Sequence, residues 1–328
     1  MPCQRSDGTS KKFLFPMDCD LHVFVVPNDL TWQWPMLGKS VPIVIPNSAG
    51  SNRPYDVVLT SIAADPPMFF IDGLLTSKQI SEFKRYARNK NHPRMLVNAA
   101  DGNPHTAWDI SNSFQTGLRQ KLRRALRLNA NSHFESIQIA RYQKGQAYDL
   151  HYDRFDWRDE YQQNWDPSRG GLNRLISVYI SLDDVAAESG GHTIFPFASK
   201  QVWQDNENEE LIIDFPPSIK NMFANGTWHD KMFDRCYGAA TRAADAKPLR
   251  IRPKAGRALV VYGSSAKTGE LYDNSAIHGS CPILDDSVKW MLKLYIWNAE
   301  PPSTGHRSVG RLEKYEVLRN VTSGENTE

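Results

Sequence analysis

After Asn131 the chain alternates short β-type segments with turn signals, and this rhythm limits its possible folds more than any other feature. Eight segments have strand character: 135–142, 148–153, 173–182, 192–196, 248–252, 257–262, 275–280 and 290–297. Many short strands separated by turns are typical of barrels and jelly rolls. We therefore expect a mainly β fold, with helices from the preceding part of the chain at its side.

A first helix is predicted to begin next to Thr76. Thr76 can cap it, and Gln79 stands three residues later, as a capping box requires. Ile80, Phe83 and Ala87 then recur with the spacing of one helical face. This pattern predicts a helix that buries one side.

A second helix is predicted over residues 115–128. Leu118, Leu122, Ala125 and Leu126 form its inward side, and five arginines or lysines stand on the other side. A basic helix side can bind a polyanion. A solvated surface on a helix that covers a sheet is the favoured interpretation.

The chain is predicted to divide into three parts. Residues 1–65 are short extended pieces cut by prolines, and we expect an N-terminal extension that packs on the barrel. Residues 66–300 form the main domain, which a polar insertion or lid at 200–247 interrupts. Residues 301–328 form a polar tail, and residues 91–113 show no period and are predicted to be a loop.

Charge and composition exclude several classes of protein. The 39 basic and 37 acidic residues nearly cancel, so nothing global favours nucleic acid or an anionic membrane as a partner. We find no apolar run of about 20 residues and no signal peptide, so the chain is expected to be cytoplasmic if it is full length. Four cysteines are too few for a disulfide scaffold, and whether Cys236 and Cys281 pair stays open.

The most specific chemical feature is the triplet His151-Tyr152-Asp153, at the end of a strand-like segment. Residues i and i+2 of a strand point to one side, so this imidazole and this carboxylate converge. His278 lies on a later predicted strand, and Gly279 beside it allows a close approach to the backbone. Two histidines and one carboxylate leave three positions of a metal open, which suits a non-haem Fe(II) oxygenase.

Lys289 adds a possible anion contact. It follows His278 by eleven residues and opens an apolar strand, so its ammonium group is expected to be buried. A buried lysine needs a partner, and the distal carboxylate of 2-oxoglutarate would be one. The alternative is a lysine that extends along the barrel rim to solvent. The remaining histidines lack such surroundings and are interpreted as structural or surface residues.

Four segments of the chain resemble, in the right order, the catalytic domain of prolyl 4-hydroxylases. They are ARYQKGQAYDLHYDRF, GGLNRLISVYISLDDVAAESGGHTIFP, LRIRPKAGRALVVYG and GELYDNSAIHGSCPILDDSVKW. They cover most of residues 134–298. The resemblance implies a double-stranded β-helix (a jelly-roll barrel) with helices packed on one sheet. It also implies an enzyme that uses Fe(II), 2-oxoglutarate and O₂, with ascorbate as reductant.

The resemblance also assigns the metal and co-substrate residues. It implies that His151, Asp153 and His278 hold Fe(II) and act in catalysis, and that Lys289 binds the distal carboxylate of 2-oxoglutarate. One more residue than usual separates His278 from Lys289, so Lys293, on the same side of the strand, is the rival anchor. Trp290 follows Lys289 as in the family, and this favours Lys289.

Three further residues are expected near 2-oxoglutarate. Tyr142 matches a family tyrosine close to that site, and Ser177 matches a small hydroxyl residue that faces it. Strand alternation predicts that Ser177 and Tyr179 point inward together.

Substrate residues follow less directly. Tyr148 and Arg174 match residues that line the proline-binding groove of the family, and Tyr295 stands where a tryptophan is usual. Trp297 replaces a frequent histidine, and His192 replaces a glutamate in the stretch GGHTIFP. These departures leave the iron chemistry intact and bear on the substrate.

The leading hypothesis is hydroxylation of prolyl residues in a peptide or protein. The alternatives are hydroxylation of a lysyl residue, of a free amino acid or of another small molecule on the same scaffold. A binding module without turnover would not need both the metal residues and Lys289. A zinc hydrolase of related fold would leave the buried lysine unexplained.

Overall fold

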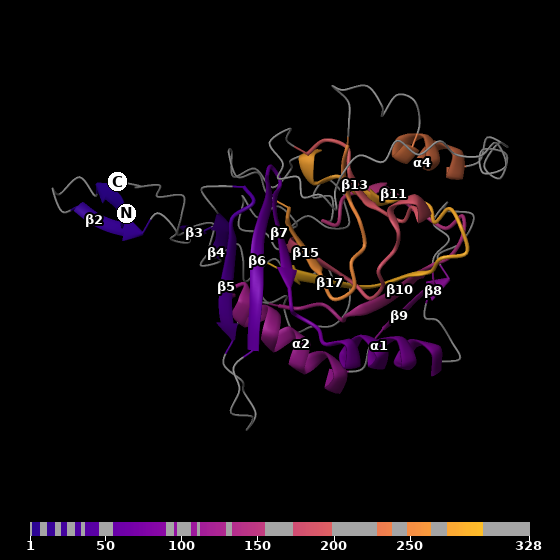
Figure 1. Ribbon diagram of the computed structural model, residues 1–328, viewed down its shortest axis with the longest axis horizontal. Coiled ribbons are helices and arrows are strands. Elements are labelled where there is room, and N and C mark those ends of the chain that lie inside the picture. The colour runs from indigo at the N-terminus through magenta and orange to yellow at the C-terminus, as the bar shows by residue number, and fades with distance from the viewer. Residues whose placement is uncertain are drawn as a thin grey trace, which may run out of the picture.

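Two β-sheets face each other in the computed structural model, with helices on both sides (Figure 1). The structure describes residues 2–6, 12–16, 21–24, 30–33, 37–45, 55–89, 95–96, 106–109, 112–128, 133–154, 173–198, 228–237, 248–263 and 274–297.

The large sheet has nine strands in the order β5-β6-β7-β15-β12-β17-β10-β9-β8. Their bounds are β5 Ser40–Ile45, β6 Tyr55–Ala64, β7 Pro67–Asp72, β8 Met95–Leu96, β9 Thr106–Asp109, β10 Gln138–Tyr142, β12 Arg174–Ser181, β15 Ala258–Tyr262 and β17 Lys289–Trp297. Every pairing in it is antiparallel. In this strand order β17 lies near the middle of the sheet, and all nine of its residues are buried.

The small sheet has the order β11-β16-β13-β14. Its strands are β11 Tyr148–His151, β13 Thr193–Phe195, β14 Leu249–Ile251 and β16 His278–Ser280. Two further strand pairs lie near the N-terminus: β1 Pro2–Ser6 with β2 Lys12–Pro16, and β3 Leu21–Phe24 with β4 Leu30–Gln33. The eight strands predicted after Asn131 are all confirmed, as β10 to β17. The mainly β jelly-roll fold is confirmed as well, although the described strands form separate sheets and not one closed barrel.

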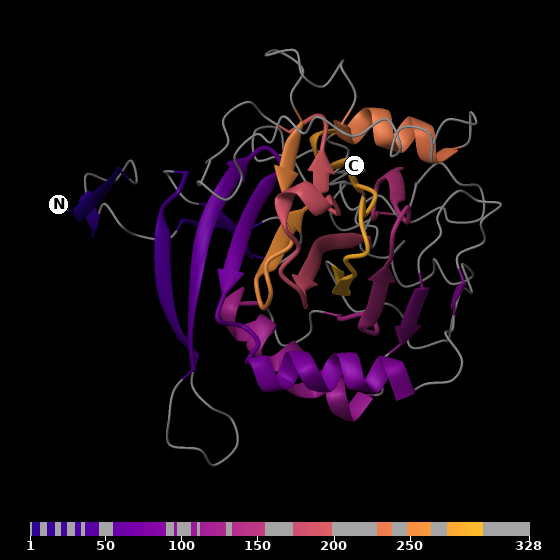
Figure 2. The same cartoon turned by 45° about the vertical axis from the view of Figure 1, so that its right-hand side comes forward.

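Helices α1 (Ser77–Asn89) and α2 (Asn112–Ala125) lie on one side of the molecule, and α4 (Trp228–Tyr237) lies on the opposite side (Figures 1 and 2). Short 3-10 turns occur at η3 (Ala187–Ser189) and η6 (Asn274–Ala276). The capping box of α1 is confirmed, because the Gln79 backbone N–H donates to Thr76 Oγ1 and the Thr76 N–H donates to Gln79 Oε1. No helix in the described ranges is long and apolar enough to cross a membrane.

The inward sides of α1 and α2 are confirmed. Phe83 and Ala87 of α1, and Leu118 and Leu122 of α2, are buried in one cluster with the even-numbered apolar residues of β17.

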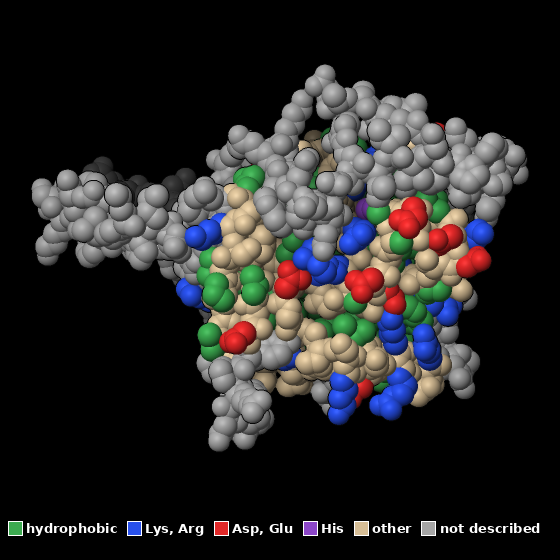
Figure 3. All heavy atoms as spheres, in the orientation of Figure 1, with side chains coloured by type: hydrophobic (Ala, Val, Ile, Leu, Met, Phe, Trp, Pro, Cys, Tyr) green, Lys and Arg blue, Asp and Glu red, His purple; other side chains and the backbone are tan. Residues whose placement is uncertain are grey.

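Figure 3 shows Lys and Arg side chains on the surface where α1 lies. On the predicted basic side of the second helix, Arg124 and Arg127 are exposed, which agrees with a solvated surface. The prediction is wrong for the other three basic residues, which are half-buried: Arg119 donates to the carbonyl oxygen of Glu135, Lys121 donates to that of Leu74, and Arg123 lies over the ring of Phe134.

Alternation along β17 separates two cores. Trp290, Leu292, Leu294 and Ile296 pack toward the helices, whereas Met291 belongs to a second cluster between the sheets. Because side chains alternate along a strand, Lys289, Lys293, Tyr295 and Trp297 share the side of Met291. The side of β17 that faces the small sheet is therefore rich in polar and aromatic groups.

One predicted loop is wrong. Residues 91–113 contain β8 and β9, and α2 begins at Asn112, before the predicted start. A strand of two or four residues is too short to show a period, and β9 forms because it pairs with β10 at the sheet edge. Pairing with a neighbouring strand, and not the local sequence pattern, decides whether such a short segment becomes a strand.

The predicted division into parts stays a prediction. Strands β5 and β6 come from the predicted N-terminal extension and are hydrogen-bonded members of the large sheet, and β6 and β7 form a hairpin across residue 65. Helix α4 is the described part of the predicted insertion 200–247. The predicted tail 301–328 lies outside the described residues.

Candidate active site

His151, Asp153 and His278 come together between the sheets. His151 ends β11, His278 begins β16, and the two are cross-strand partners. Their rings lie 4.6 Å apart, centroid to centroid. Asp153 follows just beyond β11, and its carboxylate oxygens lie 3.4 Å from Nε2 of His151 and 3.4 Å from Nε2 of His278. All three ligand atoms lie within 4.8 Å of one another.

The backbone orients both imidazoles. Nδ1 of His151 lies 2.7 Å from the carbonyl oxygen of Asp149, and Nδ1 of His278 lies 3.0 Å from that of Ala276. A carbonyl can only accept, so Nδ1 carries the proton in each ring. Each Nε2 then carries the lone pair that can bind a metal, as in most histidine metal sites.

The charge of the carboxylate suits a metal ligand. Burial on its own would raise the pKa of Asp153, but His278 and His151 outweigh burial and hold that pKa well below its usual range. Burial lowers the pKa of His278 to about 4, although Asp153 opposes this shift. Near neutral pH the site therefore offers one anion and a neutral His278, the forms that bind metal.

Tyr179 and Ser177 approach the same carboxylate from β12 in the large sheet. The Tyr179 hydroxyl donates to Asp153 Oδ2 and lies 2.7 Å from Nε2 of His278. Ser177 also forms a side-chain hydrogen bond with Asp153. Both side chains point inward, as strand alternation predicted, and both contact metal-ligand candidates.

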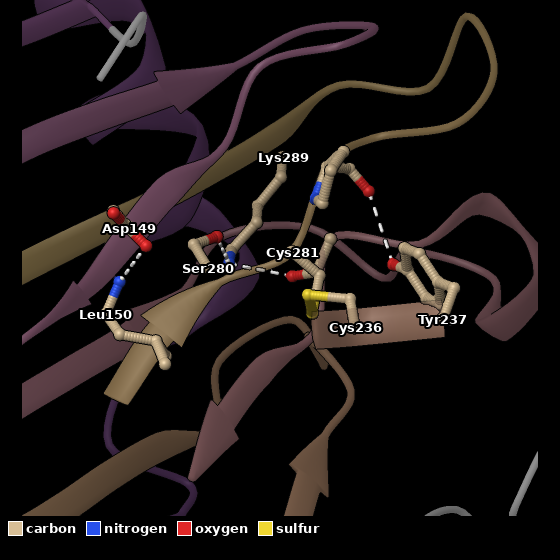
Figure 4. The surroundings of a disulfide bond; sticks show 9 residues. Asp149, Leu150, Cys236, Tyr237, Ser280, Cys281 and Lys289 are labelled. Atoms are coloured by element: carbon tan, nitrogen blue, oxygen red, sulfur yellow. Dashed lines mark hydrogen bonds between the residues drawn. A yellow bond between two sulfur atoms is a disulfide. The ribbon is translucent and has the colours of Figure 1, made fainter. Parts of the chain in front are cut away.

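Lys289 is buried between the two sheets, with 1% of its surface exposed. Its ammonium donates to the carbonyl oxygen of Gly191 and to Ser280 Oγ, each at 2.8 Å (Figure 4). Tyr142 pairs with it across the strands, and the Lys289 ammonium lies 5.1 Å from the centre of that ring. Burial and the nearby Lys293 lower the pKa of Lys289 to about 7.

Lys293 lies two inward positions after Lys289 on the same strand, with Met291 between them. It is 6% exposed, and its ammonium lies 4.4 Å from the centre of the Tyr148 ring. Its cross-strand partner on β12 is Tyr179. Two buried lysines thus line the space beside Tyr142, and Lys293 is the one opposite the residue that contacts the metal ligands.

Arg174 and Tyr295 meet at the far end of this space. The Arg174 guanidinium lies 3.8 Å from the centre of the Tyr295 ring. It donates twice to the Glu135 carboxylate, at 2.5 and 2.8 Å, and once to the carbonyl oxygen of Asp153, at 2.8 Å. Trp297 Nε1 donates to the same carboxylate at 2.6 Å. Arg174 thus ties Glu135 to the backbone of a metal-ligand candidate.

Sequence reasoning did not select Glu135 as a site residue. Its partners are 39 and 162 residues away along the chain, so no local pattern points to them. The sequence did contain one signal of a buried acceptor here, because Trp297 stands where the family usually has a histidine. An indole N–H needs an acceptor when buried, and Glu135 is that acceptor.

Tyr148 stands beside the histidines. Its ring packs edge-on against His151, with centroids 4.1 Å apart. Phe195 of β13 stacks on His278 at 5.4 Å. Aromatic rings therefore cover both imidazoles and limit access of water to their faces.

Helix α4 is joined to the strand that carries His278. A disulfide links Cys236 to Cys281, and Tyr237 donates to the carbonyl oxygen of Pro282 (Figure 4). A Cβ on Gly279 would lie 2.7 Å from Met232 Cε of α4. Gly279 thus allows the helix, rather than a ligand, to approach β16 closely.

The donor set fits Fe(II). Two imidazole nitrogens and one carboxylate oxygen gather on one side, and this is the set that non-haem Fe(II) oxygenases use. A site for zinc hydrolysis would not account for the two lysines buried next to it.

Comparisons with known proteins also indicate an Fe(II)-dependent oxygenase. The model of the 2OG-Fe(II) oxygenase superfamily matches residues 137–297. The chain is similar to prolyl 4-hydroxylase 13 of Arabidopsis thaliana, with 26% identity over 76% of each chain. It is also similar to probable prolyl 4-hydroxylase 9 of that plant, with 30% identity over 55% of this chain and 46% of the relative. It thus spans less than half of that second relative.

Solved structures include similar folds. One is the viral collagen prolyl hydroxylase of Paramecium Bursaria Chlorella virus-1, with a TM-score of 0.43, 18% identity, and coverage of 70% of this chain and 95% of that one. Another is a Pseudomonas putida prolyl-4-hydroxylase, with a TM-score of 0.39, 14% identity, and coverage of 71% and 92%. The match to the 2OG-Fe(II) oxygenase superfamily over residues 137–297, together with the geometry of the donor set, identifies the chain as a dioxygenase that uses Fe(II) and 2-oxoglutarate.

Proposed function

We propose that this dioxygenase hydroxylates prolyl residues in a peptide or protein. The observation that carries the proposal is the aromatic ring of Tyr148, which packs against His151 within 4.1 Å, beside the three metal-ligand candidates. A flat ring at that place can fix a prolyl ring by apolar contact. The relatives named above as prolyl 4-hydroxylases support the same substrate.

In this proposal His151, Asp153 and His278 hold Fe(II) and form the catalytic centre. When bound, Fe(II) with 2-oxoglutarate and O₂ supplies the oxidation of an unactivated C–H bond, with succinate and CO₂ as by-products. The protein's part is orientation. The two Nδ1 hydrogen bonds aim the imidazoles, and the low pKa of Asp153 keeps its carboxylate charged. Ascorbate as reductant stays a prediction.

We assign the distal carboxylate of 2-oxoglutarate to Lys289. Its ammonium is buried, and Tyr142 and Ser280 surround it with a ring and a hydroxyl. A lysine held this way can exchange its contact with a backbone carbonyl for a charged one. Ser177 and Tyr179 complete the co-substrate side, because their hydroxyls already contact Asp153.

The substrate side is formed by Tyr148, Tyr295 and Arg174. The contacts of Arg174 refine its expected role. Its guanidinium donates to both carboxylate oxygens of Glu135 and to the carbonyl oxygen of Asp153. Arg174 therefore holds the metal-ligand segment in place, and its contact with a peptide carbonyl stays a proposal that rests on the family resemblance.

The location of the protein is a separate question. Disulfides persist in oxidising compartments and are rare in the cytosol. The Cys236–Cys281 bond favours an oxidising compartment over the cytoplasmic location that the sequence led us to expect.

The test is a product assay on the Fe(II)-loaded protein. We would incubate it with 2-oxoglutarate and, in separate reactions, a proline-rich peptide, a matched lysine-rich peptide and free proline, and measure succinate and the mass of each substrate. Hydroxyproline in the peptide, reduced by Tyr148→Ala, is the expected result. Oxygen on lysine, or on free proline alone, would overturn the proposal. The exposed residue Lys144 supplies a control variant, Lys144→Met.

A further inference from the structure

Ser280 carries a buried hydroxyl to which the proposed reaction assigns no contact with a ligand. It lies on β16, with 6% of its surface exposed, and its Oγ accepts a hydrogen bond of 2.8 Å from the Lys289 ammonium (Figure 4). A serine hydroxyl can accept and donate at the same time. Because Lys289 uses Ser280 as an acceptor, the hydroxyl proton can be donated to another group.

The Lys289 ammonium has a donor for the same purpose. An ammonium group carries three N–H donors. In the described part of the chain, two of them are directed at the carbonyl oxygen of Gly191 and at Ser280 Oγ, each at 2.8 Å. Lys289 Nζ and Ser280 Oγ are therefore neighbouring donors, close enough for one carboxylate to accept from both.

The small sheet holds Ser280 in position before any ligand binds. Its cross-strand partners are Tyr148 of β11 on one side and Thr193 of β13 on the other. A donor on a strand that is paired on both sides loses little freedom when it contacts a ligand, so more of the interaction appears as affinity.

The spacing along β16 suits a short keto acid. His278 and Ser280 are residues i and i+2 of this strand, so their side chains share one side and their Cα atoms lie about 6.5–7 Å apart. The chain of 2-oxoglutarate has four carbon–carbon bonds of about 1.5 Å and spans about 5 Å when extended. A keto acid whose chelating end lies at His278 can thus reach Ser280 with its distal carboxylate.

We propose that Ser280 binds the distal carboxylate of 2-oxoglutarate directly, alongside Lys289. The proposal rests on the assignment of that carboxylate to Lys289. The Ser280 hydroxyl donates to a carboxylate oxygen while it accepts from the ammonium, so the two side chains form one site. Ser280 then helps the enzyme to distinguish keto acids, because 2-oxobutyrate, which lacks the distal carboxylate, cannot accept this hydrogen bond.

The test is calorimetry of keto-acid binding to the anaerobic, Fe(II)-loaded protein. The ligands are 2-oxoglutarate and 2-oxobutyrate, and the variants are Ser280→Ala and the control Ser81→Ala, which removes an exposed hydroxyl of α1. Loss of a hydrogen bond to a charged group predicts that Ser280→Ala weakens 2-oxoglutarate about tenfold and 2-oxobutyrate less than twofold. Ser81→Ala should change neither. Unchanged 2-oxoglutarate binding in Ser280→Ala, or an equal loss for both ligands, would overturn the proposal.

A double variant separates direct binding from an effect through Lys289. In the Lys289→Met protein, Ser280→Ala should still weaken 2-oxoglutarate by about threefold or more, because the hydroxyl keeps its own contact with the carboxylate. If Ser280→Ala has no effect on 2-oxoglutarate in that protein, the hydroxyl only positions the ammonium and the proposal is wrong.

The assignments of Lys289 and Ser280 can fail separately. If Ser280→Ala selectively weakens 2-oxoglutarate and Lys289→Met does not, the assignment of Lys289 is refuted and Ser280 is supported as a ligand. If Lys289→Met selectively weakens 2-oxoglutarate and Ser280→Ala does not, Lys289 is supported and the proposal for Ser280 is refuted.

Discussion

Replacement of Lys289 by methionine should weaken 2-oxoglutarate binding strongly and specifically. The Lys289 ammonium is buried and donates two hydrogen bonds of 2.8 Å, so it is held in place before any ligand arrives. A hydrogen bond to a charged group contributes about 1.5–3 kcal/mol. That free energy corresponds to an increase of about 10-fold to 150-fold in the apparent KM for 2-oxoglutarate.

The assay is succinate release at several concentrations of 2-oxoglutarate, for the wild type, Lys289→Met and Lys293→Met. Binding of 2-oxobutyrate, which lacks the distal carboxylate, provides the matched comparison. Lys289→Met should change the affinity for 2-oxobutyrate less than twofold. Methionine fits the site in length, and removal of a buried charge often preserves stability, so the thermal midpoint should not fall.

Two results would refute this reasoning. If Lys293→Met raises the KM for 2-oxoglutarate and Lys289→Met does not, the extra residue between His278 and Lys289 has misaligned the assignment. If Lys289→Met weakens 2-oxobutyrate as much as 2-oxoglutarate, the lysine acts on the fold of the site and not on the distal carboxylate.

Four further predictions follow from single contacts. His278→Ala should bind Fe(II) poorly and lose succinate release, measured by metal analysis and turnover, because one of three ligands is gone. Glu135→Gln should lower stability by about 1–3 kcal/mol in denaturant unfolding and raise succinate release without product, because Arg174 loses its charged partner. Leu122→Ala should lower the free energy of unfolding by about 2–5 kcal/mol, because this side chain of α2 is fully buried against the large sheet. Cys236→Ser should cost about 2–4 kcal/mol in unfolding under non-reducing conditions, because the bond closes a span of 45 residues.

Local patterns were enough for the eight strands after Asn131 and for the convergence of His151 with Asp153. Alternation of side chains placed His151 and Asp153 on one side, and they do converge, although β11 ends at His151 and Asp153 lies in the bend beyond it. Neither the sequence pattern around His151 nor that around His278 predicts that these two residues pair across neighbouring strands. It arises because β11 and β16 are neighbours in the small sheet.

Contacts between distant segments could not be predicted in the same way. The bond of Glu135 to Arg174 and Trp297 depends on the meeting of β12 and β17 with the segment before β10. The disulfide depends on the position of α4, which lies inside the segment 200–247 that the sequence predicted only as a polar insertion or lid. Polar and covalent links of this kind are set by the tertiary structure, so the sequence alone left them open.

The most direct test of the account is the stoichiometry of product and succinate on one proline-rich peptide. We predict one hydroxyproline for each succinate in the presence of Fe(II), 2-oxoglutarate and O₂, and neither product with Asp153→Ala. Succinate that forms at the same rate with and without peptide, or oxygen found on a residue other than proline, would contradict prolyl hydroxylation.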